Sequence, residues 1–294
     1  MRFDHLNLSL LGFGEAATAF ASGWNRDALG RISAFDVKVL LDIGQAVIED
    51  RCRQLKVSFA GDLETALRDA QIVISLVTAD QSEEAAKAAA SCLGKGVLFI
   101  DGNSCAPKTK GRSAEAVSSS AADYVDMAIM APVHPHREKT PVLLSGPQAY
   151  RAERLLTALG MNVRVVGDRV GQASAIKLTR SVMVKGMEAL FAECFLAARR
   201  GGVEEEVIRS LETSDPDIEW RKRLSYVLQR TTQHGVRRAA EMSEAAAMVA
   251  DLGLPSVMSR GSVEWQALLG NLPVEAQDAG PVLEAMGLAP EASG

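Results

Sequence analysis

A glycine-rich turn near the N-terminus is the first stretch whose residue types and spacing indicate chemistry. Gly12-Phe13-Gly14-Glu15-Ala16-Ala17 follows a short apolar run that begins at Leu6. In a dinucleotide-binding βαβ unit, the first glycine makes a tight turn, the second lets the backbone approach a pyrophosphate, and a small third residue packs the helix on the strand. The pyrophosphate then lies on the free amides of the helix N-terminus. We therefore predict a dinucleotide site, with cofactor contacts at Gly12, Phe13, Gly14, Glu15 and Ala16.

Asp36 supplies the acidic partner that such a site requires. It closes a second apolar run, residues 32–35, about twenty residues beyond the glycines, where a carboxylate is expected to hold the adenosine ribose hydroxyls. A carboxylate there would repel a 2′-phosphate, which favours NAD over NADP. Arg31 precedes the run instead of following it and is no obvious phosphate clamp.

Two further segments are expected at the same site. Residues 70–78 and 96–100 are apolar runs typical of buried parallel strands, and ligands of doubly wound sheets bind beyond the carboxyl ends of the strands. We therefore expect Val77, Thr78 and Asn103 beside the cofactor. Composition alone favours a plain surface turn for residues 101–104.

A lysine early in a long helix is the candidate for proton transfer. Lys177 lies near the start of the helix predicted over residues 173–200, with Arg180 one turn further on the same face. Desolvation or a cationic neighbour lowers the pKa of a lysine toward neutrality, where the amine can take or give a proton during a reaction. The pattern alone, however, favours a charged edge of an otherwise apolar helix.

A basic segment further along offers a candidate anion site. Six basic residues and no acid occur between Arg221 and Arg238. Charge runs are usually a solvated helix face or a subunit contact. The alternative is that His234, with Arg237 or Arg238, binds a substrate carboxylate or phosphate, to which the arginine fork is suited.

The elements that must position these residues form two domains. Strand-like and helix-like segments alternate up to residue 168, which predicts an α/β Rossmann domain, a doubly wound and mostly parallel sheet, over residues 1–168. The chain then turns helical, which predicts an all-α domain over residues 169–294, joined by the long helix. Further helices are expected over residues 203–211, 218–229, 234–252 and 256–269, with a short peripheral helix in the tail.

Composition narrows the function classes. The 294 residues carry a net charge of -5, which argues against nucleic-acid binding. Four irregularly spaced cysteines favour reduced thiols in a cytoplasmic protein. His134 and His136 lack an evident third ligand, so we expect no metal site. The sequence contains no apolar run long enough for a membrane span.

Four motifs resemble the β-hydroxyacid dehydrogenase superfamily, which includes 6-phosphogluconate and 3-hydroxyisobutyrate dehydrogenases. They are LGFGEAATAFA, FIDGNSCAPKT, VDMAIMAPVHP and GQASAIKLTRS, at residues 11–21, 99–109, 125–135 and 171–181. The resemblance implies hydride transfer between NAD, or NADP, and a CH–OH group of a small anionic β-hydroxyacid or the corresponding keto acid. It places Asn103 by the nicotinamide ribose and Lys177 at the catalytic lysine.

Departures from the family pattern lie where the substrate is expected. In VDMAIMAPVHP the serine of the family's DAPVSGG motif is replaced by Met130, and its two glycines by Ala131 and Pro132. The asparagine pair after the lysine is replaced by Arg180-Ser181. The family's substrate contacts therefore cannot be transferred, and these positions define the substrate side of a divergent subgroup.

Two other functions remain open. Imine reductases share the two-domain architecture but generally lack the catalytic lysine, so Lys177 counts against that function. A non-catalytic nucleotide-sensing protein would keep the Rossmann domain and tolerate the altered substrate motif. We also expect a homodimer, because the apolar linking helix and the helical domain require a large partner surface.

Overall fold

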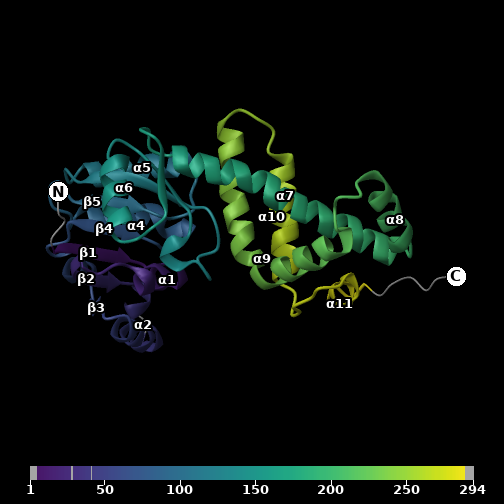
Figure 1. The fold of residues 1–294 in the computed structure, drawn as a ribbon, viewed down its shortest axis with the longest axis horizontal. Helices are drawn as coiled ribbons and strands as arrows, with labels where there is room; N and C mark the ends of the chain where they lie inside the picture. Colours follow the sequence, from purple (N-terminus) through teal and green to yellow (C-terminus); the bar gives the residue numbers. More distant parts are fainter. Residues whose placement is uncertain (1–4, 28, 41, 289–294) are drawn as a thin grey trace. The chain divides into compact units, whose positions relative to one another are not determined.

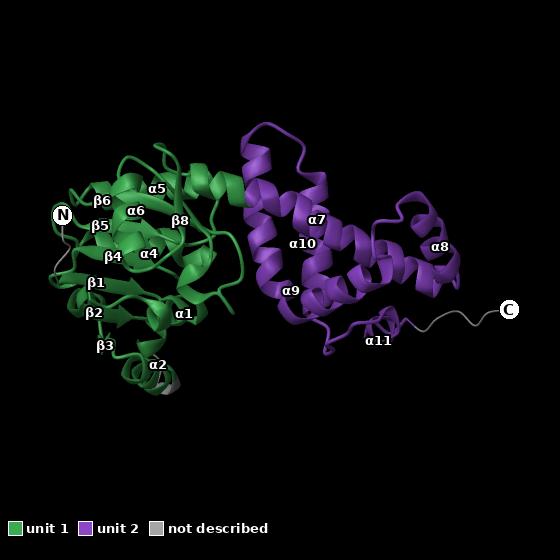
Figure 2. Cartoon of the chain, viewed as in Figure 1, with its two compact units in different colours: residues 1–177 green, residues 178–294 purple. Residues whose placement is uncertain are grey.

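The computed structural model describes residues 5–27, 29–40 and 42–288. The chain forms two compact units, residues 1–177 and 178–294 (Figure 2). Helix α7 (Gln172–Arg200) crosses from one unit to the other. The expected domain boundary at residue 168 lies just before this helix.

The first unit is built on an eight-stranded sheet with the order β3-β2-β1-β4-β5-β6-β7-β8 (Figure 1). All neighbouring strands are parallel except β6 and β7. The prediction of a doubly wound, mostly parallel sheet is confirmed. The strands are β1 (Leu6–Leu11), β2 (Leu29–Phe35), β3 (Ser58–Phe59), β4 (Ile72–Ser75), β5 (Leu98–Asp101), β6 (Asp123–Ile129), β7 (Val142–Ser145) and β8 (Val163–Gly167).

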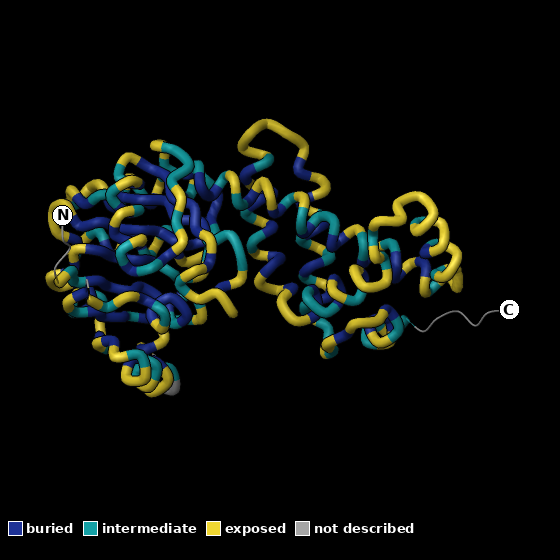
Figure 3. Tube along the Cα trace, in the orientation of Figure 1, coloured by how far each residue is buried: buried dark blue, intermediate teal, exposed yellow. Residues whose placement is uncertain are grey.

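Helices cover both faces of this sheet, which explains why its central strands are mostly apolar. In β4, Ile72 and Ile74 face one core and Val73 faces the other, and Figure 3 shows the central strands as buried. The first core is completed by α1 (Glu15–Gly23), α2 (Asp42–Gln54) and α6 (Ala149–Ala158). The second is completed by α3 (Leu63–Leu67), α4 (Ser82–Ala90) and α5 (Pro107–Ser118).

The strand order reverses at β1, which lies between β2 and β4. In doubly wound sheets the ligand crevice lies at such a reversal, beyond the carboxyl ends of the strands. Short 3-10 helices η1 (Val37–Leu40) and η2 (Ala79–Gln81) follow β2 and β4 at this edge, and η3 (Arg137–Lys139) precedes β7. The cofactor segments expected from the sequence therefore leave the sheet at its ligand-binding edge.

The second unit is helical, as expected. Beyond α7 it contains α8 (Glu204–Ser214), α9 (Trp220–Asp251), α10 (Val257–Gly270) and α11 (Ala279–Ala285). Its core includes Phe195, Leu228, Leu269 and Val282. Across the described ranges of both units, every helix is too short or too polar to traverse a lipid bilayer.

The prediction of two helices over residues 218–229 and 234–252 was wrong, because α9 is continuous through Gly235. A Cβ at Gly235 would collide with the carbonyl oxygen of Gln266 and lie 2.7 Å from Gly270 Cα. This glycine therefore permits close packing of α9 on α10 and does not end a helix. The hydroxyls of Thr231 and Thr232 each donate to the carbonyl four residues earlier, at 2.8 Å, so they too are satisfied within the helix.

Candidate functional site

The glycine turn after β1 has a backbone that only glycine adopts without strain. Gly12 has φ +81°, and a Cβ there would lie 2.5 Å from the carbonyl oxygen of Leu76, just after β4. Its amide donates to the carbonyl of Phe35 at 2.8 Å. Gly12 thus joins the carboxyl ends of β1, β2 and β4 at one point.

Gly14 is a glycine for a different reason. It is the N-cap of α1, with φ -88° and without a side-chain cap for the first-turn amides. A Cβ at Gly14 would meet no described protein atom within 4 Å. Contacts within the protein therefore do not require glycine here, whereas a pyrophosphate that approaches the amides does. The turn fits the phosphates of a dinucleotide.

Asp36 fastens the glycine turn to the end of β2. Its Oδ2 accepts the Phe13 amide at 2.9 Å, and its Oδ1 accepts the Lys38 amide at 3.0 Å. Asp36 as a whole is 9% exposed. Each carboxylate oxygen accepts more than one hydrogen bond, so capacity is left for ribose hydroxyls. The sequence did not indicate Arg51, whose Nη1 donates to the Phe13 carbonyl at 3.2 Å.

The loop after β5 brings Asn103 to the same edge. The side-chain Nδ2 of Asn103 donates to Ser75 Oγ at 3.0 Å and to Ser82 Oγ at 3.1 Å. Asn103 Oδ1 and Ser104 Oγ are buried without a hydrogen-bond partner among the described residues. Buried polar atoms in proteins are nearly always satisfied, so this loop offers an acceptor and a hydroxyl to a ligand. Of the other expected cofactor residues, Val77 lies beside Gly12, and Thr78 is exposed just before η2.

Beneath this loop lies a buried ionic cluster that the sequence analysis missed. Lys110, on α5, is completely buried, and its Nζ donates to Asp101 at both the carbonyl oxygen and Oδ1, each at 2.8 Å. The same Nζ lies 3.5 Å from Asp126 Oδ1. Burial lowers the pKa of Lys110, but the carboxylates of Asp101 and Asp126 outweigh it and raise that pKa. The only sequence signal was a lysine on the face of α5 that carries Ser113 and Val117.

Asp101 and Asp126 are opposite partners on the parallel strands β5 and β6. Tyr124 donates its hydroxyl to Asp101 Oδ2 at 2.6 Å, and burial followed by the Asp101 charge raises the pKa of that phenol well above its ordinary value. Ser82 also donates to Asp101 Oδ2, at 3.2 Å. Formally, one lysine and two aspartates leave this buried cluster with one excess negative charge.

Asp126 holds the first turn of α7. Its Oδ2 accepts the Ser174 amide at 3.0 Å, and its Oδ1 accepts the Ser174 hydroxyl at 2.6 Å. Ser145 Oγ bridges the same turn, because it donates to Asp126 Oδ2 at 3.1 Å and accepts the Ala173 amide at 2.9 Å. Lys177, partly exposed, follows one turn later on α7.

The expected substrate residues are distributed over both units. Met130 follows β6, and its amide donates to the Pro141 carbonyl at 2.9 Å; Ala131 is partly exposed. In the helical unit, Ser181 is buried, whereas the other candidates Arg180, His234 and Arg237 are exposed.

Arg238 differs from the other candidate anchors because it is only 4% exposed. Its Nε donates to Gln266 at 3.1 Å, and it pairs with the buried Glu188. Arg238 thus serves internal contacts of the helical unit, while Arg237 next to it is open to a ligand. Gln266 also donates to Glu188 at 3.4 Å.

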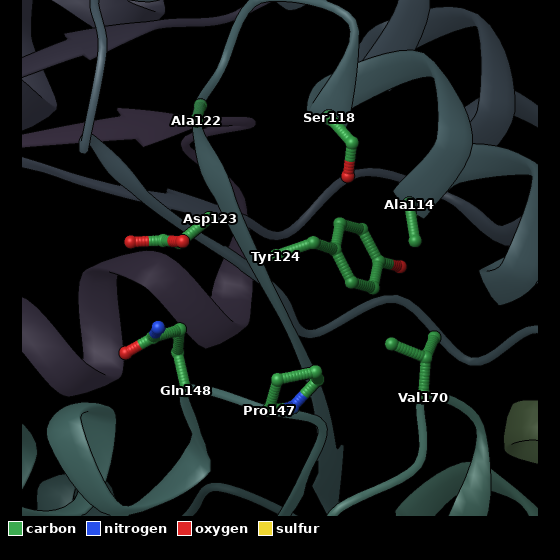
Figure 4. Close-up of a pocket in the computed structure, with 8 residues that line it drawn as sticks. All are labelled: Ala114, Ser118, Ala122, Asp123, Tyr124, Pro147, Gln148 and Val170. Atoms are coloured by element: carbon green, nitrogen blue, oxygen red, sulfur yellow. The ribbon is translucent and has the colours of Figure 1, made fainter.

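A cavity of about 150 Å³ lies at the opposite edge of the sheet (Figure 4). It is bounded by the first residues of β6, including Asp123 and Tyr124, and by Pro147, Gln148 and Val170. None of the expected cofactor residues lines it.

Within residues 5–27, 29–40 and 42–288, no group of three or more His, Cys, Asp or Glu side chains is arranged to hold a metal.

Comparisons with known proteins find a family match in each part of the chain. Residues 34–167 match the NAD-binding domain of 6-phosphogluconate dehydrogenase. Residues 198–269 match a domain of unknown function, DUF1932. The chain is 35% identical to a conserved hypothetical protein from Sinorhizobium meliloti 1021 of solved structure, with 97% of each chain covered and a TM-score of 0.79.

Two further solved structures relate the fold to hydroxyacid dehydrogenases. The conserved protein MTH1747, of unknown function and described as structurally similar to 3-hydroxyacid dehydrogenases, is 27% identical over 96% of this chain and 99% of its own, with a TM-score of 0.71. The 3-hydroxyisobutyrate dehydrogenase of Mycobacterium tuberculosis, solved with L-serine, is 13% identical over 96% and 99% of the two chains, with a TM-score of 0.75. The second likeness concerns the fold alone.

The two family matches and the relatives of solved structure together place this chain in the β-hydroxyacid dehydrogenase superfamily. Within it, this chain belongs to a divergent subgroup that joins an NAD-binding domain of the 6-phosphogluconate dehydrogenase type to a DUF1932 domain. Family and structural neighbours together support an NAD(P)-dependent oxidoreductase.

Proposed function

We propose that this protein is an NAD-dependent dehydrogenase that interconverts a small, anionic 3-hydroxy acid and its keto acid. The observation that carries the proposal is the glycine turn, where Gly14 leaves unfilled space over the first-turn amides of α1. The bound nicotinamide would supply the hydride acceptor or donor. The partnerless Asn103 Oδ1 and Ser104 Oγ support a ligand at the adjoining loop.

Lys177 is the proposed general acid and base. In the oxidative direction, the neutral amine of Lys177 would accept the hydroxyl proton of the substrate as the carbonyl forms, while the hydride from the same carbon would leave for the bound cofactor. In the reductive direction the ammonium form returns that proton.

The altered motif positions Met130, Ala131 and Ser181 are proposed to shape the substrate side. Arg180, exposed one turn beyond Lys177, is the proposed anchor for a substrate carboxylate. His234 and Arg237 are a second anchor pair within the helical unit. Arg237→Ala is then expected to raise the Michaelis constant of the acid substrate, whereas Arg238→Ala should chiefly lower stability, because it leaves Glu188 buried and unpaired.

NAD is the proposed cofactor because Asp36 is fixed close to the glycine turn. Two backbone amides hold its carboxylate, and an ionised carboxylate repels a 2′-phosphate at the adenosine ribose.

We further infer a homodimer, with apolar side chains of the helical unit in the contact. Met183, Val236 and Met258 are among those exposed in the single chain. Analytical ultracentrifugation tests this state, and a monomer at micromolar concentration would refute it.

The decisive assay is the absorbance of NADH during turnover of a panel of acids. The panel contains 3-hydroxyisobutyrate, 3-hydroxypropionate and L-serine, each with NAD and with NADP, and cyclic imines with NADH and NADPH. We expect oxidation of at least one hydroxy acid with NAD, abolished in Lys177→Ala, with calorimetric NADH affinity unchanged in that variant. Turnover of imines alone would indicate an imine reductase. Tight NADH binding without turnover would indicate a nucleotide-sensing protein.

A further inference from the structure

We propose that Asp126 is a positioning residue that holds Lys177 in register with the Asn103 loop through the buried cluster Asp101–Lys110–Asp126. The proposal rests on the proposed role of Lys177 as proton donor and acceptor. It concerns residues of the first unit only, up to the first turns of α7.

The link from Asp126 to Lys177 is short and made by charge-assisted hydrogen bonds. Both oxygens of Asp126 bind Ser174, one through its amide and one through its hydroxyl. Such bonds to an ionised acceptor are stronger and more directional than neutral ones. Since Ser174 and Lys177 lie three residues apart on one helix, they occupy neighbouring positions on its surface. A shift of the first turn therefore moves the amine of Lys177 by a similar amount.

The link from Asp126 to the cofactor loop runs through Lys110. This ammonium contacts the carboxylates of both Asp101 and Asp126. Asp101 Oδ1 also accepts the backbone N–H of Asn103 at 2.9 Å, so Asp101 fixes the loop at its first turn. One buried cation thus holds two carboxylates, one of which orients the cofactor loop and the other the lysine-bearing helix.

The arrangement of the cluster has an electrostatic reason. Two carboxylates on opposite positions of adjacent strands repel each other. The ammonium of Lys110 contacts both and so holds them together. A buried ion pair is weak evidence for stability, because apolar residues of the same volume often stabilise as well. Apolar residues, however, could not orient the Asn103 loop and the first turn of α7 as the cluster does.

The test compares Ser174→Ala and Asp126→Asn with the matched variant Ser33→Ala. Ser33 and Ser174 are both 3% exposed serines of the first unit whose hydroxyls are hydrogen-bonded. Ser33 lies in β2 and contacts Ser9 and Ala66, outside the cluster. Both serine variants therefore lose one buried hydroxyl. A change seen in Ser174→Ala but not in Ser33→Ala reports an effect on Lys177 and not a general loss of stability.

Two measurements are made on each folded variant. The first is steady-state kinetics with the acid that the wild type turns over. We expect a fall in kcat of about 10²-fold for Asp126→Asn, as for a misplacement of about 1 Å, with the Michaelis constant for NAD unchanged. The second is the pH dependence of Lys177 acetylation by acetic anhydride, measured by mass spectrometry against the exposed Lys87 on α4.

In Ser174→Ala we expect the ratio of Lys177 to Lys87 acetylation to change and its pH profile to shift. The reason is that loss of the hydrogen bond to the charged Asp126 makes opening of the first turn of α7 about tenfold more frequent. Ser33→Ala should give the wild-type ratio and the wild-type kcat. Wild-type acetylation profiles in both folded cluster variants would overturn the proposal. The acetylation measurement needs no substrate, so it decides the matter even if the panel shows no turnover. If Asp126→Asn does not fold, Ser174→Ala alone decides.

Discussion

The two glycines of the turn after β1 should respond to alanine in opposite ways. At Gly12 the backbone has φ +81°, and a Cβ would lie 2.5 Å from the Leu76 carbonyl oxygen. The left-handed conformation costs about 1–2 kcal/mol and an overpacked contact about 1–3 kcal/mol. Gly12→Ala should therefore lower the free energy of unfolding by roughly 2–5 kcal/mol.

At Gly14 the backbone is one that alanine adopts, and a Cβ meets no described atom within 4 Å. Gly14→Ala should change stability by less than about 0.5 kcal/mol. The added methyl group occupies the space assigned to the pyrophosphate, and the loss of one or two hydrogen bonds to a charged group should weaken NADH binding about 10- to 100-fold.

Urea unfolding and NADH calorimetry on both variants measure the two effects separately. Tight NADH binding by a stable Gly14→Ala protein would refute the assignment of the turn to the cofactor phosphates. Wild-type stability of Gly12→Ala would refute the geometric argument for the turn itself.

Three other predictions follow from single contacts. Asp36→Ser removes the charge that repels a 2′-phosphate, so the ratio of NADPH to NADH affinity, measured by fluorescence titration, should rise; an unchanged ratio would contradict the role of Asp36. Gly235→Ala drives a methyl group into the backbone of α10 and should lower unfolding stability by about 1–3 kcal/mol or more in a thermal melt, whereas Gly261→Ala, with open space around its Cβ, should not. The pKa values of Lys110 and Tyr124 are both raised in the folded protein, so the folded state holds these protons longer than the unfolded chain. Their stabilisation is complete at neutral pH and is lost above about pH 10; urea midpoints that stay flat to higher pH would show that these groups contribute nothing.

The meeting of the glycine turn with Asp36 was predictable from the sequence because its determinants are local. A strand, a glycine turn, a helix and a following acid lie within one short stretch, and the roles of Gly12 and Asp36 follow from that order. The alternation of strands and helices likewise fixed the order in which Val77 and Asn103 reach the same edge. Asn103 contacts Ser75, the last residue of β4, and Gly12 lies against Leu76, the residue after it.

The buried cluster was not predictable because it depends on strand register. Asp101 and Asp126 become partners only once β5 and β6 pair, and Lys110 reaches them from a helix whose pattern is typical of a solvated surface. The break expected before His234 was wrong for a similar reason. Gly235 lies inside a helix and is a glycine because the backbone of Gly270, far along the chain, occupies the space that a side chain would need.

The bonds between Asp126 and Ser174 determine where the chain could be divided. A fragment that stops at residue 168 retains both carboxylates and Lys110 but lacks Ser174, whose amide and hydroxyl both donate to Asp126. It would leave a charged oxygen pair without two of its donors, and such a fragment should be prone to local opening at β6. Extension of the fragment through the first turns of α7 supplies those donors. The nucleotide-binding half is therefore self-sufficient only when it carries the beginning of the helix that leads out of it.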